Sequence, residues 1–464
     1  MAIWKPNLDP SRGAIYLQIV EALADDIRSG ALLPGTRLPP YRELGFQLGV
    51  SASTTNRAYT EAIDRALIHG EVGRGTFVRE MPAAEMPHWR DELSRPNDGP
   101  VDLSRNLPSP AMSEQRLAKT LRAISGEGGL SRFTDYETEL DQSARDEAAI
   151  SWLGKAGLNA TANEITTTAG ARHGLFCALM AVCQPGDLLL VEELSYAPVR
   201  AMAEKLALKV KAVSIDQDGL EPDALEAVCR GSAARALYVT PTLQTPTTST
   251  MPLERRHAIA ALAKAQELVV IEDDVFGLLL PSVPTPLAHM LPEHSVYLTS
   301  TSKYLAPGFR VGFARASERL TRAIRQAVDL SNWMLPPLMV EIAARWIKDG
   351  TADGLIASQR SHARARQDLA ATILKEHAFA ANRNGLHLWM ELPPEIHSTS
   401  VVAEMERRGV LGLSDVSFRM APNVTANAIR LCLSHEPEED RIRSGLEQVA
   451  DILDQWPTLP RRFV

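Results

Sequence analysis

One lysine and one arginine stand seven residues apart in a single hydroxyl-rich stretch. Lys303 ends a Ser-Thr-Ser-Lys turn between two short apolar runs, and Arg310 follows it before the second run. A lysine amine whose pKa is lowered by partial burial and a nearby cation can form a Schiff base. Ser300, Ser302 and Arg310 supply donors for phosphate oxygens. The stretch predicts a site for a phosphate-bearing aldehyde cofactor, although an ordinary surface lysine in a loop has the same short pattern.

Two further groups suit the same chemistry. Asp273 follows the apolar run Leu268–Ile271, where a carboxylate either caps a loop or pairs with a protonated pyridine nitrogen. A helix is expected to begin after Thr168, and the free N–H groups of Gly170, Ala171 and Arg172 would form an anion site at its positive end. The alternative for this second group is a plain helix start.

Three other residues are candidates for contacts with a ring or a ligand. Tyr196 follows an apolar run and can stack on a pyridine ring, although an isolated tyrosine is more often an ordinary core or surface residue. Thr245 lies in TPTLQTPTT, which follows another predicted strand and can line the ring edge. Arg430, in the strand-like run AIRLCL, can clamp a carboxylate bidentately or make a surface ion pair.

The N-terminal residues predict a separate helix-turn-helix with a hairpin wing. Apolar residues four apart indicate a helix over 15–30, and shorter patterns indicate helices over 41–48 and from Ser51 to about Leu67. Two strands are expected over 68–72 and 76–79, joined by Gly73-Arg74-Gly75. The alternative is a small helical subdomain with a solvated polar face, because residues 1–80 carry nine basic and nine acidic side chains and are neutral.

A DNA-binding function for this segment would use the first exposed turn of the last helix. Ser53, Thr54, Asn56 and Arg57 can reach base edges and phosphates in a major groove. Arg42 and Arg74 are placed to contact phosphates.

Length and composition limit the number of domains, the cellular location and the state of the cysteines. At 464 residues the chain should fold as two or three units, and 45% apolar and 23% charged residues are typical of a globular protein. No apolar run reaches membrane-helix length and the first residues lack a signal-peptide pattern, so a cytoplasmic location is expected. The four cysteines lack C-x-x-C spacing and predict free buried thiols, and no metal site is indicated.

Beyond the N-terminal segment, residues 80–100 are rich in proline and polar residues and predict a linker. Apolar runs then alternate with helical patterns over 101–464, which favours an α/β domain. The expected strands are 188–192, 236–240, 268–272, 295–299 and 311–314.

Taken in order, these motifs resemble a known family. Residues 14–79 are similar to the GntR-type winged helix through IYLQIVEALADDIRSG, LLPGTRLPPYRELGFQLGVS, TTNRAYTEA and GRGTFV. The rest resembles a fold-type I aminotransferase through the Thr168 helix start, Tyr196, TPTLQTPTT, IEDDVFG, STSKYLAPGFRVG, NGLHLWMELP and AIRLCLS. Together they resemble the MocR group of pyridoxal 5'-phosphate (PLP)-dependent transcriptional regulators.

The resemblance implies a multidomain fold. It consists of a winged helix-turn-helix at 1–79, a linker at 80–100 and an α/β PLP-dependent transferase fold of type I at 101–464, with a large part at about 115–340 and a small α+β part at about 341–464. By the same match, Lys303 carries the Schiff base and Asp273 contacts the pyridine nitrogen. Ser300, Ser302 and Arg310 would bind the phosphate, Tyr196 the ring face and Arg430 the effector carboxylate. Tyr136 would correspond to a tyrosine that reaches the phosphate across a dimer.

Three positions depart from the aminotransferase pattern. Thr245 replaces an asparagine and Phe276 a tyrosine, so two usual donors to the phenolic oxygen of the cofactor are missing, and Thr248 replaces a glycine. These losses favour binding over fast turnover. The expected function is a dimeric, DNA-binding regulator that senses a small amine or amino acid through an external aldimine. The alternative is a working aminotransferase with an appended DNA-binding domain.

Overall fold

The computed structural model describes residues 4–6, 14–29, 32, 35–65, 67–71, 75–78, 99–109, 113–136, 139–422 and 424–456. The chain divides into two compact units, one of residues 1–94 with 421–425 and one of residues 95–420 with 426–464. Among the helices described, none has the length and apolar character needed to cross a membrane.

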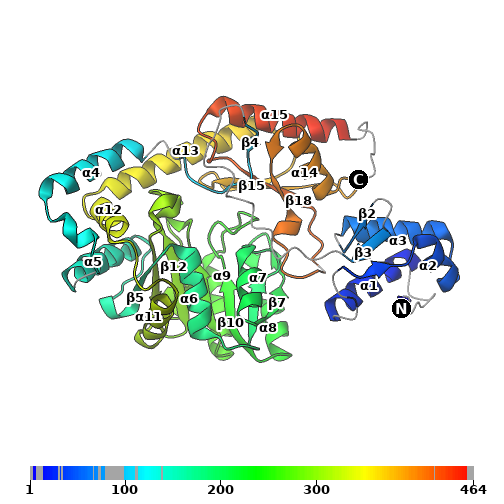
Figure 1. The fold of residues 1–464 in the computed structure, drawn as a ribbon, viewed down its shortest axis with the longest axis horizontal. Helices are drawn as coiled ribbons and strands as arrows, with labels where there is room; N and C mark the ends of the chain where they lie inside the picture. The colour runs from blue at the N-terminus through cyan, green and yellow to red at the C-terminus, as the bar shows by residue number, and fades with distance from the viewer. Residues whose placement is uncertain are drawn as a thin grey trace. The chain divides into compact units, whose positions relative to one another are not determined.

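The N-terminal unit is built from three helices and a three-stranded antiparallel sheet of order β1-β3-β2 (Figure 1). Its elements are α1 (Ile15–Ser29), β1 (Arg37–Leu38), α2 (Tyr41–Leu48), α3 (Ala52–Asp64), β2 (Ile68–Glu71) and β3 (Gly75–Val78). Gly49 closes α2 in a left-handed conformation with φ 67°, and the Ser51 hydroxyl caps α3 by accepting from the Thr54 N–H at 3.1 Å. This confirms the predicted helix-turn-helix and wing.

Helix α3 ends at Asp64, three residues earlier than predicted. The chain turns there because Leu67 and Ile68 are buried in the core that α1 and α3 share, with Ile19, Leu23 and Ala58. A helix continued to Leu67 would rotate these two side chains away from that core.

The second unit is organised around a seven-stranded sheet of order β5-β13-β12-β11-β10-β6-β7 (Figure 1). All neighbouring pairs are parallel except those made by β13, which runs antiparallel to both β12 and β5. The strands are β5 (Ile165–Thr168), β6 (Leu188–Glu192), β7 (Lys209–Val213), β10 (Ala234–Val239), β11 (Val269–Asp273), β12 (Ser295–Ser300) and β13 (Gly312–Ala316). The five predicted strands are confirmed within two residues at each end.

Helices cover both faces of this sheet, as its buried, near-continuous apolar strands require. One face packs on α6 (Ala171–Val182), α7 (Pro198–Lys205) and α11 (Glu318–Asn332). The other packs on α8 (Pro222–Arg230), α9 (Leu253–Ala265) and α10 (Leu287–Met290) towards β6, β10 and β11, and on α5 (Glu139–Lys155) and α12 (Pro337–Lys348) towards β13. Helix α4 (Glu114–Glu127) precedes α5, and a short antiparallel pair, β8 (Ile215–Asp216) with β9 (Gly219–Leu220), precedes α8.

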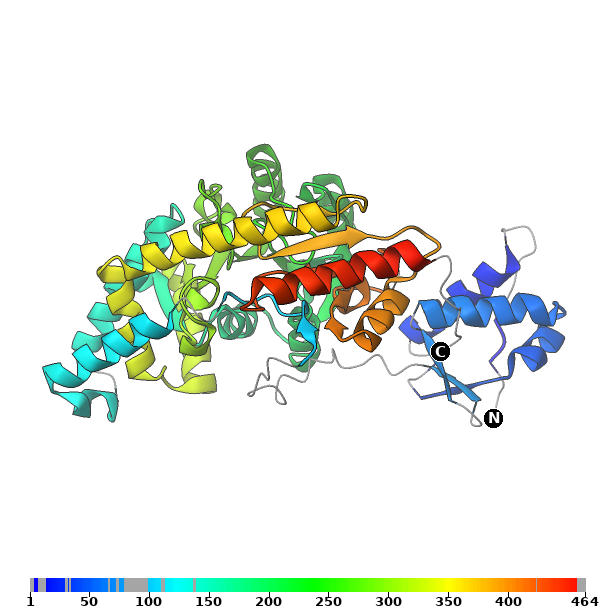
Figure 2. The ribbon, with the colours of Figure 1, turned by 90° about the horizontal axis from the view of Figure 1, so that it is seen from above.

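The C-terminal part has its own four-stranded antiparallel sheet and core. The sheet order is β14-β15-β18-β17, from β14 (Ala380–Ala381), β15 (His387–Glu391), β17 (Leu413–Ser414) and β18 (Ala428–Cys432). Helices α13 (Thr351–Ile373) and α15 (Glu439–Gln455) lie side by side over it, with α14 (Ser398–Arg407) nearby (Figure 2). The segment after the predicted linker joins this part, because β4 (Val101–Asp102) pairs with β16 (Val410–Leu411) and Val101 and Leu103 enter its core.

The four cysteines are all buried and free, as predicted.

Candidate functional site

Lys303 lies at the end of a 3-10 turn, Thr301–Lys303, that directly follows β12. Its Nζ donates to the main-chain carbonyl of Asn106 and lies 5.1 Å from the centre of the Phe276 ring. Burial lowers the pKa of Lys303 to about 8, and the nearby Arg430 and Arg310 cations shift it in the same direction. A pKa near 8 leaves about a tenth of the amine unprotonated at neutral pH. The lysine is therefore a usable nucleophile.

Asp273 ends β11, the strand next to β12, and is 8% exposed. Its Oδ2 accepts a hydrogen bond from the Tyr238 hydroxyl at 2.8 Å, and burial raises its pKa to about 6. Its Oδ1 is buried and has no hydrogen-bond partner among the described residues. Leaving a buried carboxylate oxygen unpaired is costly, so this atom suits a group that brings its own N–H.

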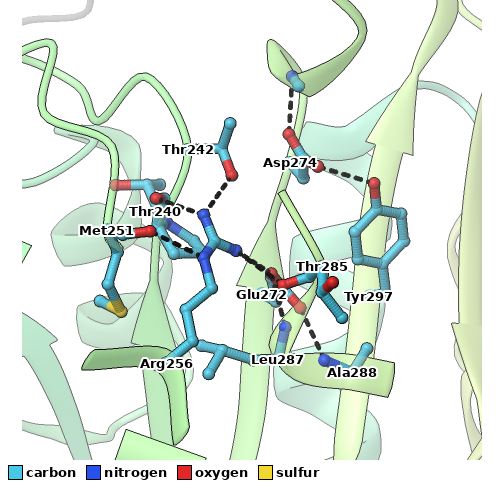
Figure 3. Close-up of polar contacts among 12 residues, drawn as sticks. Thr240, Thr242, Met251, Arg256, Glu272, Asp274, Thr285, Leu287, Ala288 and Tyr297 are labelled. Carbon is cyan, nitrogen blue, oxygen red and sulfur yellow. Dashed lines mark hydrogen bonds and ion pairs between the residues drawn. The ribbon is translucent and has the colours of Figure 1, made fainter. Parts of the chain in front are cut away.

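The acidic residues on either side of Asp273 are fixed by buried contacts (Figure 3). Glu272 accepts main-chain N–H bonds from Leu287 at 3.1 Å and Ala288 at 2.8 Å, and its Oε1 lies 3.6 Å from Arg256 Nη1. Asp274 accepts from the Tyr297 hydroxyl at 2.8 Å. These contacts hold the end of β11 from both sides and so fix the direction of the Asp273 carboxylate.

The predicted phosphate-binding groups meet where α6 begins. Arg310 Nη2 donates to the Ala169 carbonyl at 2.8 Å and crosses directly over Gly170. Gly170 has φ 83°, and a Cβ there would lie 2.9 Å from Arg310 Nη2. A Cβ on Gly312 would lie 2.8 Å from Gly170 Cα and from the Thr299 carbonyl. Only glycines permit the strands and the helix start to approach this closely.

Hydroxyl groups line the same end of the site. Ser300 Oγ accepts from the Ser302 N–H at 3.2 Å and donates to the Val311 carbonyl at 3.2 Å. Ala171 and Arg172 form the first turn of α6, with Ala171 buried and Arg172 exposed. The start of α6, the positive end of the helix dipole, therefore gathers helix N–H groups, hydroxyls and a guanidinium. These are the donors that bind an anion.

Tyr196 lies close to the charged groups of the site. Burial raises its pKa, and the charged groups that act on it are Arg172, Asp273, Arg310 and Arg430. Charged residues from separate parts of the chain therefore lie near one tyrosine.

The loop that carries Thr245 also reaches the site. Thr245 is buried beside the cis Thr245–Pro246 bond, and the ring of His387 faces the carbonyls of Gln244 and Pro246. Thr248 has φ 68°, which is the left-handed region that favours glycine and explains why glycine is the expected residue there.

Arg430 lies in the middle of β18 and is 7% exposed. Its Nη2 donates to the Ser104 carbonyl at 2.7 Å, and its guanidinium lies 4.7 Å from the centre of the Phe418 ring. No carboxylate is paired with it in the part of the chain that the structure describes. The alternative of a surface ion pair is therefore wrong, because the Arg430 side chain is buried.

Four residues at the site were not predicted from the sequence, namely Ser104, Asn106, Tyr238 and His387. Asn106 Nδ2 lies 3.0 Å from His387 Nδ1, although the residues are 281 positions apart. Tyr238 sits opposite Ile271 in the β10–β11 pair, one strand from Asp273. Tyr238 precedes TPTLQTPTT and His387 lies within NGLHLWMELP, whereas Ser104 and Asn106 lie in no recognised motif.

The candidate DNA-contacting residues lie at the start of α3 and on α2. Ser53, Asn56 and Arg57 are exposed and Thr54 is half-buried. The Arg57 guanidinium lies 4.0 Å from the centre of the Tyr16 ring and donates to its hydroxyl at 3.3 Å. Arg42 is exposed on α2, and Arg74 lies outside the described residues.

The site combines a lysine that directly follows a central strand, a buried aspartate on the neighbouring strand and a helix that begins at a closely packed glycine. In a mixed sheet of this strand order, the combination defines a PLP-dependent protein of fold type I. The chain belongs to the aminotransferase class I and II family, whose model matches residues 100–442. Residues 15–78 match the model of the gntR family of bacterial regulatory proteins. This combination is the MocR-type architecture, and its cofactor is PLP.

Curated relatives share both parts of the chain. The uncharacterized HTH-type transcriptional regulator YdeF of Bacillus subtilis is 27% identical, covering 97% of each chain. The vitamin B6 salvage pathway transcriptional repressor PtsJ of Salmonella typhimurium is 26% identical, covering 93% of this chain and 97% of its own.

Solved structures share the fold of the larger unit. Kynurenine aminotransferase of Pyrococcus horikoshii aligns with a TM-score of 0.71 at 23% identity, covering 77% of this chain and 91% of its own. LysN, the α-aminoadipate aminotransferase of Thermus thermophilus, aligns with a TM-score of 0.70 at 22% identity, covering 78% and 94%.

Proposed function

We propose that the chain is a PLP-dependent transcriptional regulator that binds DNA through its winged helix and senses a small amine or amino acid in its aminotransferase-like unit. The observation that carries the proposal is that one chain holds both a GntR-type domain and a set formed by the half-buried Lys303 with the buried Asp273 and Arg430. We expect this regulator to act in the cytoplasm, where it would meet its DNA. The relative named a vitamin B6 salvage pathway transcriptional repressor supports the regulatory role.

The residues fit the cofactor in both charge and hydrogen bonding. Asp273 Oδ1, buried without a partner, would accept from the pyridine N–H, and Lys303 would supply the amine. Tyr196 would cover the ring face, with Thr245 and Phe276 at its edge. The phosphate would be held by the residues gathered at the start of α6 and after β12, which are Gly170, Ala171, Arg172, Ser300, Ser302 and Arg310. When bound, the cofactor supplies an aldehyde that condenses with amines and a ring that accepts electrons.

The protein's own groups control how a ligand is received. Burial keeps part of Lys303 neutral, so its nitrogen can be exchanged for that of an incoming amine. Arg430 would bind an acid group on the same ligand, because its Nε has no partner in the described part of the chain and its Nη2 is held by the Ser104 carbonyl. Thr245 and Phe276 do not provide the amide and phenol donors of an aminotransferase, which favours retention of a ligand over rapid turnover.

The test is a titration of amino acids into the PLP-loaded full chain, following the cofactor absorption spectrum and the affinity for operator DNA in parallel. An effector should change both, with a coupling of about 5- to 150-fold in DNA affinity. Arg430→Ala should lose the response to ligands with an acid group while keeping the cofactor spectrum. Spectral changes without any change in DNA affinity would exclude sensing.

A working aminotransferase is the second candidate, favoured by the presence of the complete Lys303 and Asp273 pair. Incubation with amino donors and a keto-acid acceptor separates the two, since an enzyme forms new amino acid over many turnovers whereas a sensor stops after binding.

We also infer that the protein acts as a homodimer. Leu130, Tyr136, Leu330 and Trp333 are large apolar side chains that are 47%, 68%, 74% and 70% exposed, and the Tyr136 and Trp333 rings pack 6.2 Å apart. Exposed apolar groups of this size favour a protein partner, and a second copy would give two winged helices for paired DNA half-sites. In this dimer Tyr136 would reach the phosphate of the partner subunit. Sedimentation of the wild type and Trp333→Glu tests the interface.

The winged helix would read DNA through α3. Ser53, Thr54, Asn56 and Arg57 would contact bases and phosphates, and Arg42 would contact phosphate. Arg74 is assigned the same role from its place in the predicted wing.

A further inference from the structure

Asn106 lies beside the amine of the proposed site and has a hydrogen-bond acceptor without a partner. Its main-chain carbonyl accepts from Lys303 Nζ, while its side-chain Oδ1 is buried and unpaired among the described residues. Such an atom loses its hydrogen bonds to water on folding and gains none in return. Neither the cofactor contacts nor the carboxylate site proposed above uses it.

The amide nitrogen of Asn106 is engaged by its neighbour His387. Burial, with the nearby Arg430 and Lys303 cations, lowers the pKa of His387 to about 3, so the ring is neutral and carries one N–H. The Asn106 amide nitrogen lies 3.0 Å from His387 Nδ1 and can only donate, so Nδ1 is the acceptor and the ring proton is on Nε2, which has no hydrogen-bond partner among the described residues. In this arrangement the Asn106 Oδ1 is left over.

The backbone just before Asn106 is held by hydrogen bonds. Leu103 N donates to the Leu411 carbonyl at 2.9 Å, Cys432 N donates to the Leu103 carbonyl at 2.7 Å, and Arg430 binds the Ser104 carbonyl. The contact of its Nδ2 with His387 Nδ1 holds the side-chain amide itself. Because its carbonyl touches the lysine nitrogen that an incoming amine would replace, its side chain is within reach of groups one or two carbons from that amine.

We propose that Asn106 determines ligand specificity, and that its Oδ1 accepts a hydrogen bond from a hydroxyl or amine on the side chain of a short amino acid. This deepens the proposed function and rests on it. Ligands with an apolar group in the same place would leave the acceptor unpaired, and a site built for a polar group rejects such analogues strongly.

Two isosteric pairs of amino acids test the proposal, L-serine against L-2-aminobutyrate and L-homoserine against L-norvaline. Within each pair a hydroxyl is exchanged for a methyl group. Each is titrated into the PLP-loaded full chain while the cofactor spectrum is followed. The hydroxyl member of at least one pair should bind about tenfold tighter or more. Equal affinities within both pairs would overturn the assignment of Asn106 while leaving the proposed function standing. No spectral change with any amino acid would overturn both.

Variants check that Asn106 is the cause of the preference. Asn106→Leu keeps the branched shape and the number of heavy atoms and removes Oδ1, so the preference should disappear, whereas Asn106→Asp keeps an acceptor and should retain it. Asn163→Leu, the same change at an exposed position, should leave the preference unchanged. A preference that persists in Asn106→Leu would overturn the assignment. The wild-type comparison decides the question if a variant fails to fold.

Discussion

The proposed chemistry depends on one amine, and its covalent role can be tested directly. Lys303→Ala should still bind PLP through the phosphate and ring contacts, but borohydride should no longer fix the cofactor to the protein. Wild type should retain the cofactor after reduction and denaturation, as measured by the mass of the intact chain. Lys155→Ala, which removes a lysine paired with Asp353 outside the site, serves as the control. A reduced adduct of normal mass in Lys303→Ala would refute the assignment.

The lowered pKa of Lys303 predicts a pH dependence with a definite sign. Only the neutral amine attacks an aldehyde, and its fraction rises with pH until the pKa is passed. The rate of PLP attachment to the cofactor-free chain should therefore rise about tenfold per pH unit below 8 and level off above 8, because burial lowers the pKa to about 8. Stopped-flow absorbance from pH 6 to pH 10 measures this. A plateau reached only near pH 10 would show a lysine unperturbed by burial.

At the scale of elements, the end of β11 depends on a fully buried ion pair. Arg256 and Glu272 are both 0% exposed, and Arg256→Met would leave Glu272 buried without its cation. The expected loss is about 3–5 kcal/mol of the free energy of unfolding. Urea unfolding measures it, and adding Glu272→Gln should recover part of the loss. Arg230→Met, in an ion pair with 69% and 44% exposed side chains, should cost at most about 1 kcal/mol. Similar losses at the two positions would contradict the structural role of Arg256.

The close approach of β13 to the start of α6 gives a second prediction at this scale. Gly312→Ala places a Cβ 2.8 Å from main-chain atoms of Gly170 and Thr299, which cannot move independently of the sheet. We expect a loss of about 1–3 kcal/mol in stability and weaker PLP binding, since the phosphate-binding groups shift with Gly170. Gly308→Ala is the matched control because a Cβ there meets no atom within 4 Å. Unchanged PLP affinity in Gly312→Ala, measured by titration, would show that this contact does not shape the site.

Elements whose pattern matches their burial could be predicted from the sequence. The strand runs at 188–192 and 295–299 are apolar because both faces of the sheet are covered, and they were located to within a residue. Strand β7, Lys209–Val213, was missed because it is an edge strand with exposed lysines and lacks an apolar run. At the site, Lys303 and Asp273 could be picked out because each closes such a run. Asn106 and His387 could not, because their contact depends on the pairing of segments distant in sequence.

For the whole molecule, DNA binding is expected to reside in the N-terminal unit. Arg42→Ala should weaken binding to all DNA sequences alike and reduce the slope of log affinity against log salt by about one, as loss of a phosphate contact does. Fluorescence anisotropy with a fragment that the full chain binds, and with an unrelated fragment, measures both effects. Arg383→Ala removes the same charge from the other unit, where the side chain is 70% exposed. Equal effects of the two changes would indicate general electrostatics and not a contact.

The antiparallel pairing of β12 with β13 has a consequence for the order in which the site is made. Ser300 and Gly312 lie opposite each other, so Lys303 and Arg310, the arginine proposed to bind the phosphate, share one connecting loop and come together without a long-range search. Asp273, Tyr196 and the start of α6 all precede this loop in the chain. On the ribosome, the groups proposed to hold the cofactor are thus all synthesised once Ala316 has been added, whereas Arg430 follows more than a hundred residues later. A growing chain therefore contains the groups proposed to bind PLP before it contains Arg430, the residue proposed to bind the acid group of the ligand.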